Sequence, residues 1–225
     1  MNIAMDAPTP PPSSPAPPTP SRPVVRPAPW RWARDVASLG GFVLALFAAR
    51  STLADHYIVP SGSMIPTVEV GDRVLVNKLA YALRVPFSDV VLAKLHRPDR
   101  SDVVVLRSPE DSSVTLLKRV VAIPGDQVEV VQGRLRINGQ DVPVARQSGE
   151  LVERLGRGDH PVRLTGGGGP YYGPVRLGPD EYLVLGDNRG DSHDGRAFGL
   201  VDGGMILGRA LGVWMRDGRP GWHPL

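Results

Sequence analysis

The sequence contains no cysteine, few aromatic residues and little excess of either charge. Without cysteine the chain forms neither disulfides nor thiolate-based sites, and its redox compartment cannot be read from the sequence. The formal net charge is +3, and Lys and Arg do not cluster among aromatic side chains. Because such clusters are typical of nucleic-acid-binding surfaces, we expect no nucleic acid among the partners of this chain.

Proline is abundant and unevenly placed, with 11 of the 24 prolines in residues 1–29, among Ala, Thr and Ser. Such a stretch cannot bury enough apolar surface to offset the entropy lost on ordering. We therefore predict that residues 1–30 form a disordered tail or an extended spacer.

The segment that follows is largely apolar. From Val36 to Ala54 it carries one charge, Arg50, and as a helix it would span about 28 Å, close to the bilayer's hydrocarbon core of about 30 Å. Trp30 and Trp32 suit a membrane interface. The segment is preceded by Arg22, Arg26, Arg31 and Arg34. These charges predict a cytoplasmic N-terminus if the segment spans a membrane. A cleavable signal peptide and a buried core helix are the alternatives.

After residue 54 the sequence indicates β structure. Short runs rich in Val, Leu and Ile recur between turn signals, which is typical of an antiparallel β domain and not of alternating strands and helices. The expected strands are Arg73–Val76, Val103–Leu106, Thr115–Val121, Gln127–Val131, Arg134–Ile137, Tyr182–Leu185 and Leu211–Met215. Asn138-Gly139 predicts a tight hairpin turn. A short helix is expected over Asp89–Leu95, capped by Ser88.

A candidate nucleophile lies in the run Pro60-Ser61-Gly62-Ser63-Met64-Ile65-Pro66-Thr67. The prolines restrict the backbone, and Gly62 allows it to approach a substrate closely. The Ser63 hydroxyl would then lie on a rigid loop, as nucleophilic catalysis by serine requires. Taken alone, a serine between Gly and Pro is more often only part of a turn.

Three further segments follow the serine run: Gly71-Asp72-Arg73-Val74-Leu75-Val76-Asn77-Lys78, Leu117-Lys118-Arg119-Val120-Val121-Ala122-Ile123-Pro124-Gly125-Asp126 and Gly186-Asp187-Asn188-Arg189-Gly190-Asp191-Ser192-His193-Asp194-Gly195-Arg196. In this order the four segments resemble the motifs of bacterial type I signal peptidases, or leader peptidases. These are Ser–Lys serine endopeptidases that remove signal peptides from exported proteins. The resemblance covers about residues 35–215.

The resemblance implies that Ser63 is the nucleophile and that Lys118 is its general base. A lysine acts as a base only when neutral, so its pKa must fall far below the usual value of about 10.4. The apolar neighbours Leu116 and Val120, on the same face of the expected strand, would supply the necessary desolvation. The resemblance further implies that the Ser61 hydroxyl joins the Ser63 N–H in the oxyanion hole.

Other positions of the motifs carry supporting roles by resemblance. Ser192 would orient the lysine amine, with Asp194 and Arg196 bracing the site from behind. Shallow pockets that admit small substrate residues would be lined by Val59, Pro60, Met64 and Leu117. No metal or organic cofactor is implied.

The resemblance favours a mainly β protein with one transmembrane helix over residues 31–54 and an extracytoplasmic antiparallel catalytic domain over 55–225. Residues 127–180 would form a small β-rich cap insertion. The expected location is the plasma membrane, with a cytoplasmic N-terminus. The expected partners are the signal peptides of translocating preproteins and the lipid bilayer. The sequence does not indicate an oligomeric state.

The last of the four segments, Gly186 to Arg196, is called the closing segment below. It departs from the family pattern, because Gly190 and Asp191 replace Asp and Asn, and Gly195 replaces Ser. We expect a more mobile loop there.

A triad of Ser63 with His193 and Asp194 is disfavoured, because two adjacent side chains would have to converge. A self-cleaving Ser–Lys repressor-like peptidase and a non-catalytic, membrane-anchored signal-peptide-binding paralogue remain as alternative functions.

Overall fold

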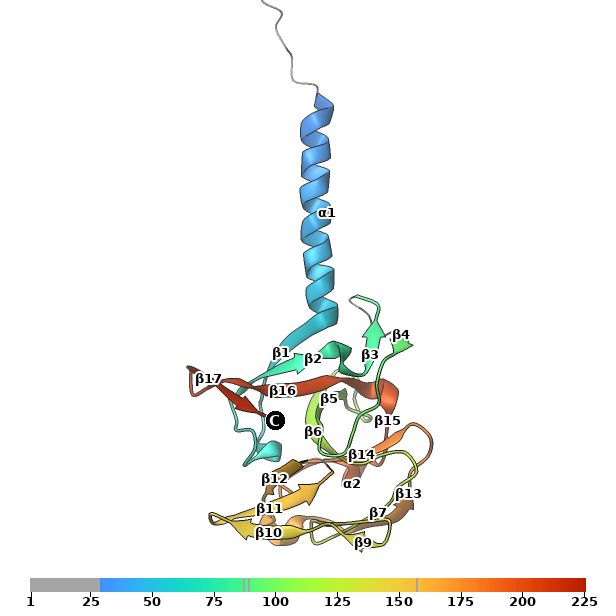
Figure 1. Cartoon of the computed structure of the whole chain (residues 1–225), viewed down its shortest axis with the longest axis vertical. Coiled ribbons are helices and arrows are strands. Elements are labelled where there is room, and N and C mark those ends of the chain that lie inside the picture. The colour runs from blue at the N-terminus through green and yellow to red at the C-terminus, as the bar shows by residue number, and fades with distance from the viewer. Residues whose placement is uncertain (1–28, 87, 89, 157) are drawn as a thin grey trace, which may run out of the picture. The chain divides into compact units, whose positions relative to one another are not determined.

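A computed structural model describes residues 29–225, with gaps at 87, 89 and 157, so nearly all of the proline-rich tail lies outside the described residues (Figure 1). The chain divides into two units, Met1–Gly41 and Phe42–Leu225. Helix α1 (Pro29–Leu53) begins at a proline, which is favourable in the first helical turn. Across the described part of the chain, no helix combines the length and the apolar character needed to cross a membrane.

The main sheet carries the candidate site. Its antiparallel strands follow the order β1-β2-β16-β5-β6-β14-β15, and β17 pairs with β16 (Figure 1). The strands are β1 (Ala54–Ile58), β2 (Arg73–Asn77), β5 (Val103–Arg107), β6 (Thr115–Ala122), β14 (Glu181–Leu185), β15 (Val201–Asp202), β16 (Ile206–Arg216) and β17 (Arg219–Pro224). Strand β6 thus lies between β5 and β14.

Apolar residues cover both faces of the sheet at β5. Val103 and Val105 belong to one buried cluster, and Val104 and Leu106 to another. Successive side chains of a strand point to opposite faces, so a strand buried on both sides is apolar throughout. The run of Val and Leu in β5 follows from this position.

Residues 127–180, the interval expected to be an insertion, form two smaller sheets. One has the order β13-β7-β8-β9 and the other β10-β11-β12. Their strands are β7 (Gln127–Val131), β8 (Arg134–Ile137), β9 (Gln140–Asp141), β10 (Val144–Gln147), β11 (Glu150–Leu155), β12 (Gly158–Val162) and β13 (Tyr172–Arg176). A short two-stranded sheet, β3 (Ala82–Arg84) with β4 (Val91–Lys94), lies outside this interval.

Short helical turns complete the described elements: α2 (Gly195–Phe198) and the 3₁₀ turns η1 (Gly62–Met64), η2 (Lys78–Ala80), η3 (Thr165–Gly168) and η4 (Gly203–Met205).

The mainly antiparallel β fold expected from the sequence is confirmed. Each of the seven expected strands falls on an observed strand, and β8 and β9 pair around the predicted turn, where Asn138 has a φ of 53°. The short helix expected over residues 89–95 is wrong where the structure describes it, because Val91–Lys94 pairs with β3 as a strand. Pairing with a neighbouring strand outweighed the local capping signal.

Candidate active site

The serine run forms a compact turn held against the sheet. Ser63 lies in η1, and the next residue, Met64, is buried in the cluster of apolar residues beside β5. The Val68 N–H donates to the Met64 carbonyl, 3.0 Å away, and Val68 is also fully buried. The buried side chains of Met64 and Val68, shortly after Ser63 in the sequence, fix the position of Ser63 at the edge of a cavity.

Lys118 lies opposite Ser63 on β6. Its Nζ is 2.6 Å from Ser63 Oγ, although the two residues are 55 positions apart in the sequence. The lysine is 3% exposed. Burial lowers its pKa from 10.5 to about 8, while the carboxylates of Asp194 and Asp187 act in the opposite direction. A base must lie within hydrogen-bond reach of the proton it removes, and this pair meets that requirement.

The hydroxyl of Ser61 also lies beside the candidate nucleophile. Its Oγ is 3.4 Å from Ser63 Oγ, and the Ser61 side chain is exposed at the mouth of the site. A polar group at this place can donate to an oxygen that develops negative charge next to Ser63.

A cavity of about 290 Å³ opens at these three side chains. Its wall includes Ser61, Ser63 and Lys118. It also includes all four residues expected to line the substrate pocket, namely Val59, Pro60, Met64 and Leu117. Further lining residues come from β1 and from the start of β6. The cavity therefore combines an apolar wall with a hydroxyl–amine pair at one place.

The closing segment positions the serine turn through Asn188, a residue that the sequence analysis did not single out. Its backbone N–H donates to the Ser63 carbonyl at 3.0 Å, and its Nδ2 donates to the Gly62 carbonyl at 3.1 Å. Two bonds from one residue fix both peptide groups around the candidate nucleophile. The motif signalled a functional segment, but only the folded chain identifies this contact.

A buried ion pair lies on the other side of β6. Arg119 donates from Nε and Nη2 to the two carboxylate oxygens of Asp187, at 2.8 and 2.7 Å, and both residues are almost fully buried. Thr67, at the end of the serine run, donates to the same carboxylate. Burial opposes ionisation of Asp187, but Arg119 keeps its pKa below the usual value. The lysine, serine and closing segments thus meet at one carboxylate.

Asp194 and Arg196 form the expected pair behind the site. Arg196 donates from Nε and Nη2 to Asp194 at 2.8 Å each, and it also donates to the Gly168 carbonyl in the insertion. Asp194 in turn accepts from the Gly186 N–H at 3.0 Å. The pair therefore fixes the start of the closing segment as well as its end.

Gly190 and Gly195, which were expected to make this loop more mobile, are both closely packed against neighbouring backbone. A β-carbon on Gly195 would lie 2.7 Å from Leu183 Cδ1 and 2.9 Å from the Val184 carbonyl oxygen, and one on Gly190 would collide with the Thr165 carbonyl. Both glycines allow a close approach of neighbouring backbone. Serine at position 195 would therefore strain the segment.

Ser192 lies next to this closely packed backbone. A β-carbon on Gly186 would collide with both Ser192 Oγ and the Ser63 carbonyl, so Ser192 is near the serine turn. Its Oγ is buried and makes no hydrogen bond among the described residues. The expected contact with the Lys118 amine is therefore not formed in this structure, and a role for Ser192 in orienting the amine stays a prediction.

His193 points elsewhere. Its Nε2 lies 2.7 Å from Glu110 Oε2, and its side chain is exposed. Because Asp194 is bound to Arg196 and His193 to Glu110, a triad of these two residues with Ser63 has no support.

The insertion is joined to the closing segment by Arg189, whose side chain is fully buried. Arg189 donates to both carboxylate oxygens of Glu153 on β11, at 3.0 and 2.6 Å, and to the carbonyls of Gly133 and Gly186. His160 on β12 lies 3.3 Å from the same carboxylate. Burial opposes ionisation of Glu153, but Arg189 lowers its pKa to about 2.

The fold and the site define an antiparallel β protein with a hydroxyl–amine pair at an apolar cavity. The family model for signal peptidase, peptidase S26, matches residues 31–215, and the chain belongs to this family.

Individual relatives agree with this assignment. A signal peptidase I of Pseudomonas aeruginosa is 36% identical over 194 residues, covering 74% of this chain and 66% of its own length. One from Pseudomonas fluorescens is 37% identical over 188 residues, with the same two coverages. One from Leptolyngbya laminosa is 30% identical over 207 residues, covering 86% of this chain and 88% of its own. The chain thus spans just under two thirds of the length of the two Pseudomonas relatives.

Proposed function

We propose that this chain is a serine endopeptidase that removes N-terminal signal peptides from exported preproteins, with Ser63 as nucleophile and Lys118 as general base. The observation that carries the proposal is the 2.6 Å separation of Lys118 Nζ and Ser63 Oγ at a cavity, with the lysine buried and its pKa lowered to about 8. Near neutral pH a useful fraction of such an amine is uncharged and accepts a proton.

The reaction follows from this geometry. The neutral Lys118 amine takes the hydroxyl proton as Ser63 Oγ attacks the scissile carbonyl. Negative charge then develops on the carbonyl oxygen, where the Ser63 N–H and the nearby Ser61 hydroxyl would stabilise it. The ammonium formed on Lys118 returns its proton to the departing amine. Water, activated by the same lysine, hydrolyses the ester on Ser63 and restores the site.

The cavity supports a preference for small residues at positions −1 and −3 of the cleavage site. Its volume of about 290 Å³ is shared among all the substrate residues that approach Ser63. Its wall is mostly apolar, with Val59, Met64 and Leu117 close to the nucleophile. A large side chain would have to displace this packed wall, so steric cost excludes it.

The test is cleavage of a preprotein by the detergent-purified full chain beside its Ser63→Ala variant. The matched control is Ser112→Ala, which removes the hydroxyl of an exposed serine. We expect cleavage by the native chain and by the control, and none by Ser63→Ala. Equal cleavage by all three would assign the activity to a contaminant, and no cleavage by the native chain would favour a non-catalytic binding protein. Replacing the −1 alanine of the preprotein by leucine is expected to abolish cleavage.

We also propose that residues 31–54 anchor the chain in the plasma membrane, with the domain from 55 onward outside the cytoplasm. Support comes from the sequence pattern, in which the stretch from Val36 to Ala54 carries the single charge of Arg50 and follows Trp30 and Trp32. Protease added to intact spheroplasts is expected to digest the domain and to leave the N-terminal tail intact. Release of the chain by alkaline carbonate would show that α1 does not span the bilayer.

A further inference from the structure

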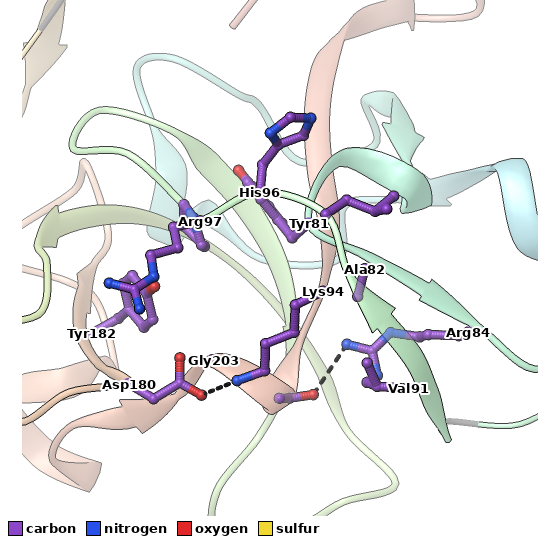
Figure 2. A pocket seen from close by; sticks show the side chains of 13 residues that line it. Tyr81, Ala82, Arg84, Val91, Lys94, His96, Arg97, Asp180, Tyr182 and Gly203 are labelled. Atoms are coloured by element: carbon purple, nitrogen blue, oxygen red, sulfur yellow. Dashed lines mark hydrogen bonds and ion pairs between the residues drawn. The ribbon is translucent and has the colours of Figure 1, made fainter.

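A second cavity, of about 370 Å³, lies beside the two-stranded sheet of β3 and β4 (Figure 2). Its wall also includes the segment after β4 and the residues Asp180 and Tyr182 at the start of β14. Ser63 and Lys118 do not line it, so it is separate from the candidate active site.

Basic side chains from three places enter this cavity. Lys94 and Arg97 are exposed, whereas Arg84 is buried in the wall. Arg84 Nη2 donates to the carbonyls of Gly204 and Ile206, at 3.1 and 2.7 Å, which fixes the guanidinium. Figure 2 marks one of these bonds with a dashed line from Arg84. This fixed guanidinium contributes positive charge to the wall of the cavity.

One carboxylate, that of Asp180, is among the described residues that line the cavity. It lies 2.6 Å from Lys94 Nζ, and the Lys94 side chain is 68% exposed (Figure 2). Exposed ion pairs of this kind contribute little free energy, so Lys94 can leave Asp180 for another anion. Arg97 contributes a further positive charge next to Tyr182.

The same small sheet also carries exposed apolar side chains. Leu83 on β3 is 36% exposed and Leu92 on β4 is 61% exposed, and neither lines the cavity. On the same two strands, Arg84 and Lys94 line the cavity. The small sheet therefore carries cations that line the cavity and exposed leucines that do not, a combination suited to the boundary between phospholipid headgroups and acyl chains.

We propose that this cavity binds the phosphate of an anionic phospholipid through Lys94 and Arg97, while Leu83 and Leu92 contact the acyl region. Anionic lipid surfaces attract Lys and Arg side chains that lie close to them. The leucines favour a lipid over a soluble phosphate, because a soluble ligand would leave them in water. The proposal does not depend on the peptidase activity.

The experiment uses the full chain in dodecyl maltoside micelles. Because the native sequence has no cysteine, Leu92→Cys introduces a unique attachment site for an environment-sensitive fluorophore. Phosphatidylglycerol is titrated into the micelles, with phosphatidylcholine as the zwitterionic comparison. We expect a blue shift of the label with phosphatidylglycerol and not with phosphatidylcholine.

The matched variants distinguish a specific site from general attraction. Lys94→Gln with Arg97→Gln is expected to raise the phosphatidylglycerol fraction at half-change about tenfold or more. Arg134→Gln with Arg176→Gln removes the same charge from exposed positions in the insertion. This control is expected to leave the phosphatidylglycerol fraction at half-change within about twofold of that of the parent protein. Equal shifts in both double variants, or no response of the parent protein to phosphatidylglycerol, would overturn the proposal.

A last arm separates lipid from soluble phosphate. Glycerol 3-phosphate is titrated against the detergent-purified full chain by calorimetry, with the Lys94→Gln, Arg97→Gln variant as reference. We expect no measurable heat at concentrations where the lipid response is complete. Tight binding of glycerol 3-phosphate that is lost in the variant would overturn the lipid assignment and identify a soluble phosphate as the ligand.

Discussion

Lys118 and Arg119 are adjacent on β6, and each is 3% exposed, yet their surroundings differ in one respect. Lys118 faces the neutral hydroxyl of Ser63, whereas Arg119 makes two bonds to the carboxylate of Asp187. Successive side chains of a strand point to opposite faces, so a single step along the chain changes the environment. The comparison teaches that equal burial leaves an amine with a lowered pKa beside a hydroxyl on one side of the strand and a compensated ion pair on the other.

The two residues also affect stability in opposite ways. Burial lowers the pKa of Lys118 from 10.5 to about 8, so the folded protein binds this proton less tightly than the unfolded chain does. The resulting cost to stability, on the order of 3 kcal/mol, is fully present below pH 8 and disappears as the pH rises towards 10.5. Arg119, by contrast, favours the folded state, because its positive charge neutralises the buried carboxylate of Asp187.

The largest expected effect breaks the chemical side of the comparison. Ser63→Ala and Lys118→Ala should each lower kcat for preprotein cleavage by about 10⁴-fold or more, because the pair acts as a unit. Lys118→Arg should be equally inactive, since a guanidinium does not lose its proton to act as a base. Single-turnover cleavage assays measure the loss, and circular dichroism checks the fold. Activity of Lys118→Ala near that of the native chain would remove the lysine from the mechanism.

A second change tests the architectural side. Arg119→Met leaves the Asp187 carboxylate buried without its guanidinium and should destabilise the fold by about 3–5 kcal/mol. Lys118→Met removes a charge that burial disfavours and should stabilise the fold at pH 7 by about 1–3 kcal/mol. Denaturant titrations followed by tryptophan fluorescence compare the two variants directly. If both methionines destabilised the protein to the same degree, the contrast between the two positions would be wrong.

Ser192 offers a smaller change on the chemical side. Ser192→Ala should lower kcat by about tenfold to a thousandfold if its hydroxyl turns towards the Lys118 amine when substrate binds. The KM should change little, because Ser192 does not line the substrate cavity. A steady-state assay separates the two constants. Native kcat in the Ser192→Ala variant would exclude this serine from the mechanism.

The last expected effect is continuous and concerns pH. Only neutral Lys118 accepts the Ser63 proton, so kcat/KM should rise about tenfold per pH unit below pH 8 and level off above it. The measurement is a pH–rate profile with a preprotein whose own groups do not titrate in this range. A profile that is flat between about pH 5 and about pH 9 would contradict a lysine base.

Much of the fold could be predicted because the strands of the core are short apolar runs. Strand β5 is buried on both faces, and its four consecutive Val and Leu residues show this in the sequence. Strand β17 is exposed throughout and has no such signal, so it was missed. The sequence predicts a helix at β4 because Ser88 is a favourable helix cap. The pairing of β4 with β3 leaves no local sign in the sequence.

The candidate site was predictable only in part. Four motifs in the family's order pointed to Ser63 and Lys118, whereas a serine among Gly and Pro, taken alone, is more often part of a turn and a strand lysine is more often solvated. The bonds from Asn188 to the serine turn, and from Arg119 to Asp187, join segments 126 and 68 positions apart. No spacing within either segment specifies its distant partner, so these contacts required the folded chain.

The bond between Asn188 and the Gly62 carbonyl has a consequence for the order of assembly. A contact between residues 126 positions apart closes a long loop, and the entropy cost of such closure delays it relative to local pairing. A growing polypeptide that ends before residue 188 has Ser63 and Lys118 but lacks the residue that fixes the turn around Ser63. We therefore expect proteolytic competence to arise only when the domain is nearly complete, which protects the emerging chain from its own active site.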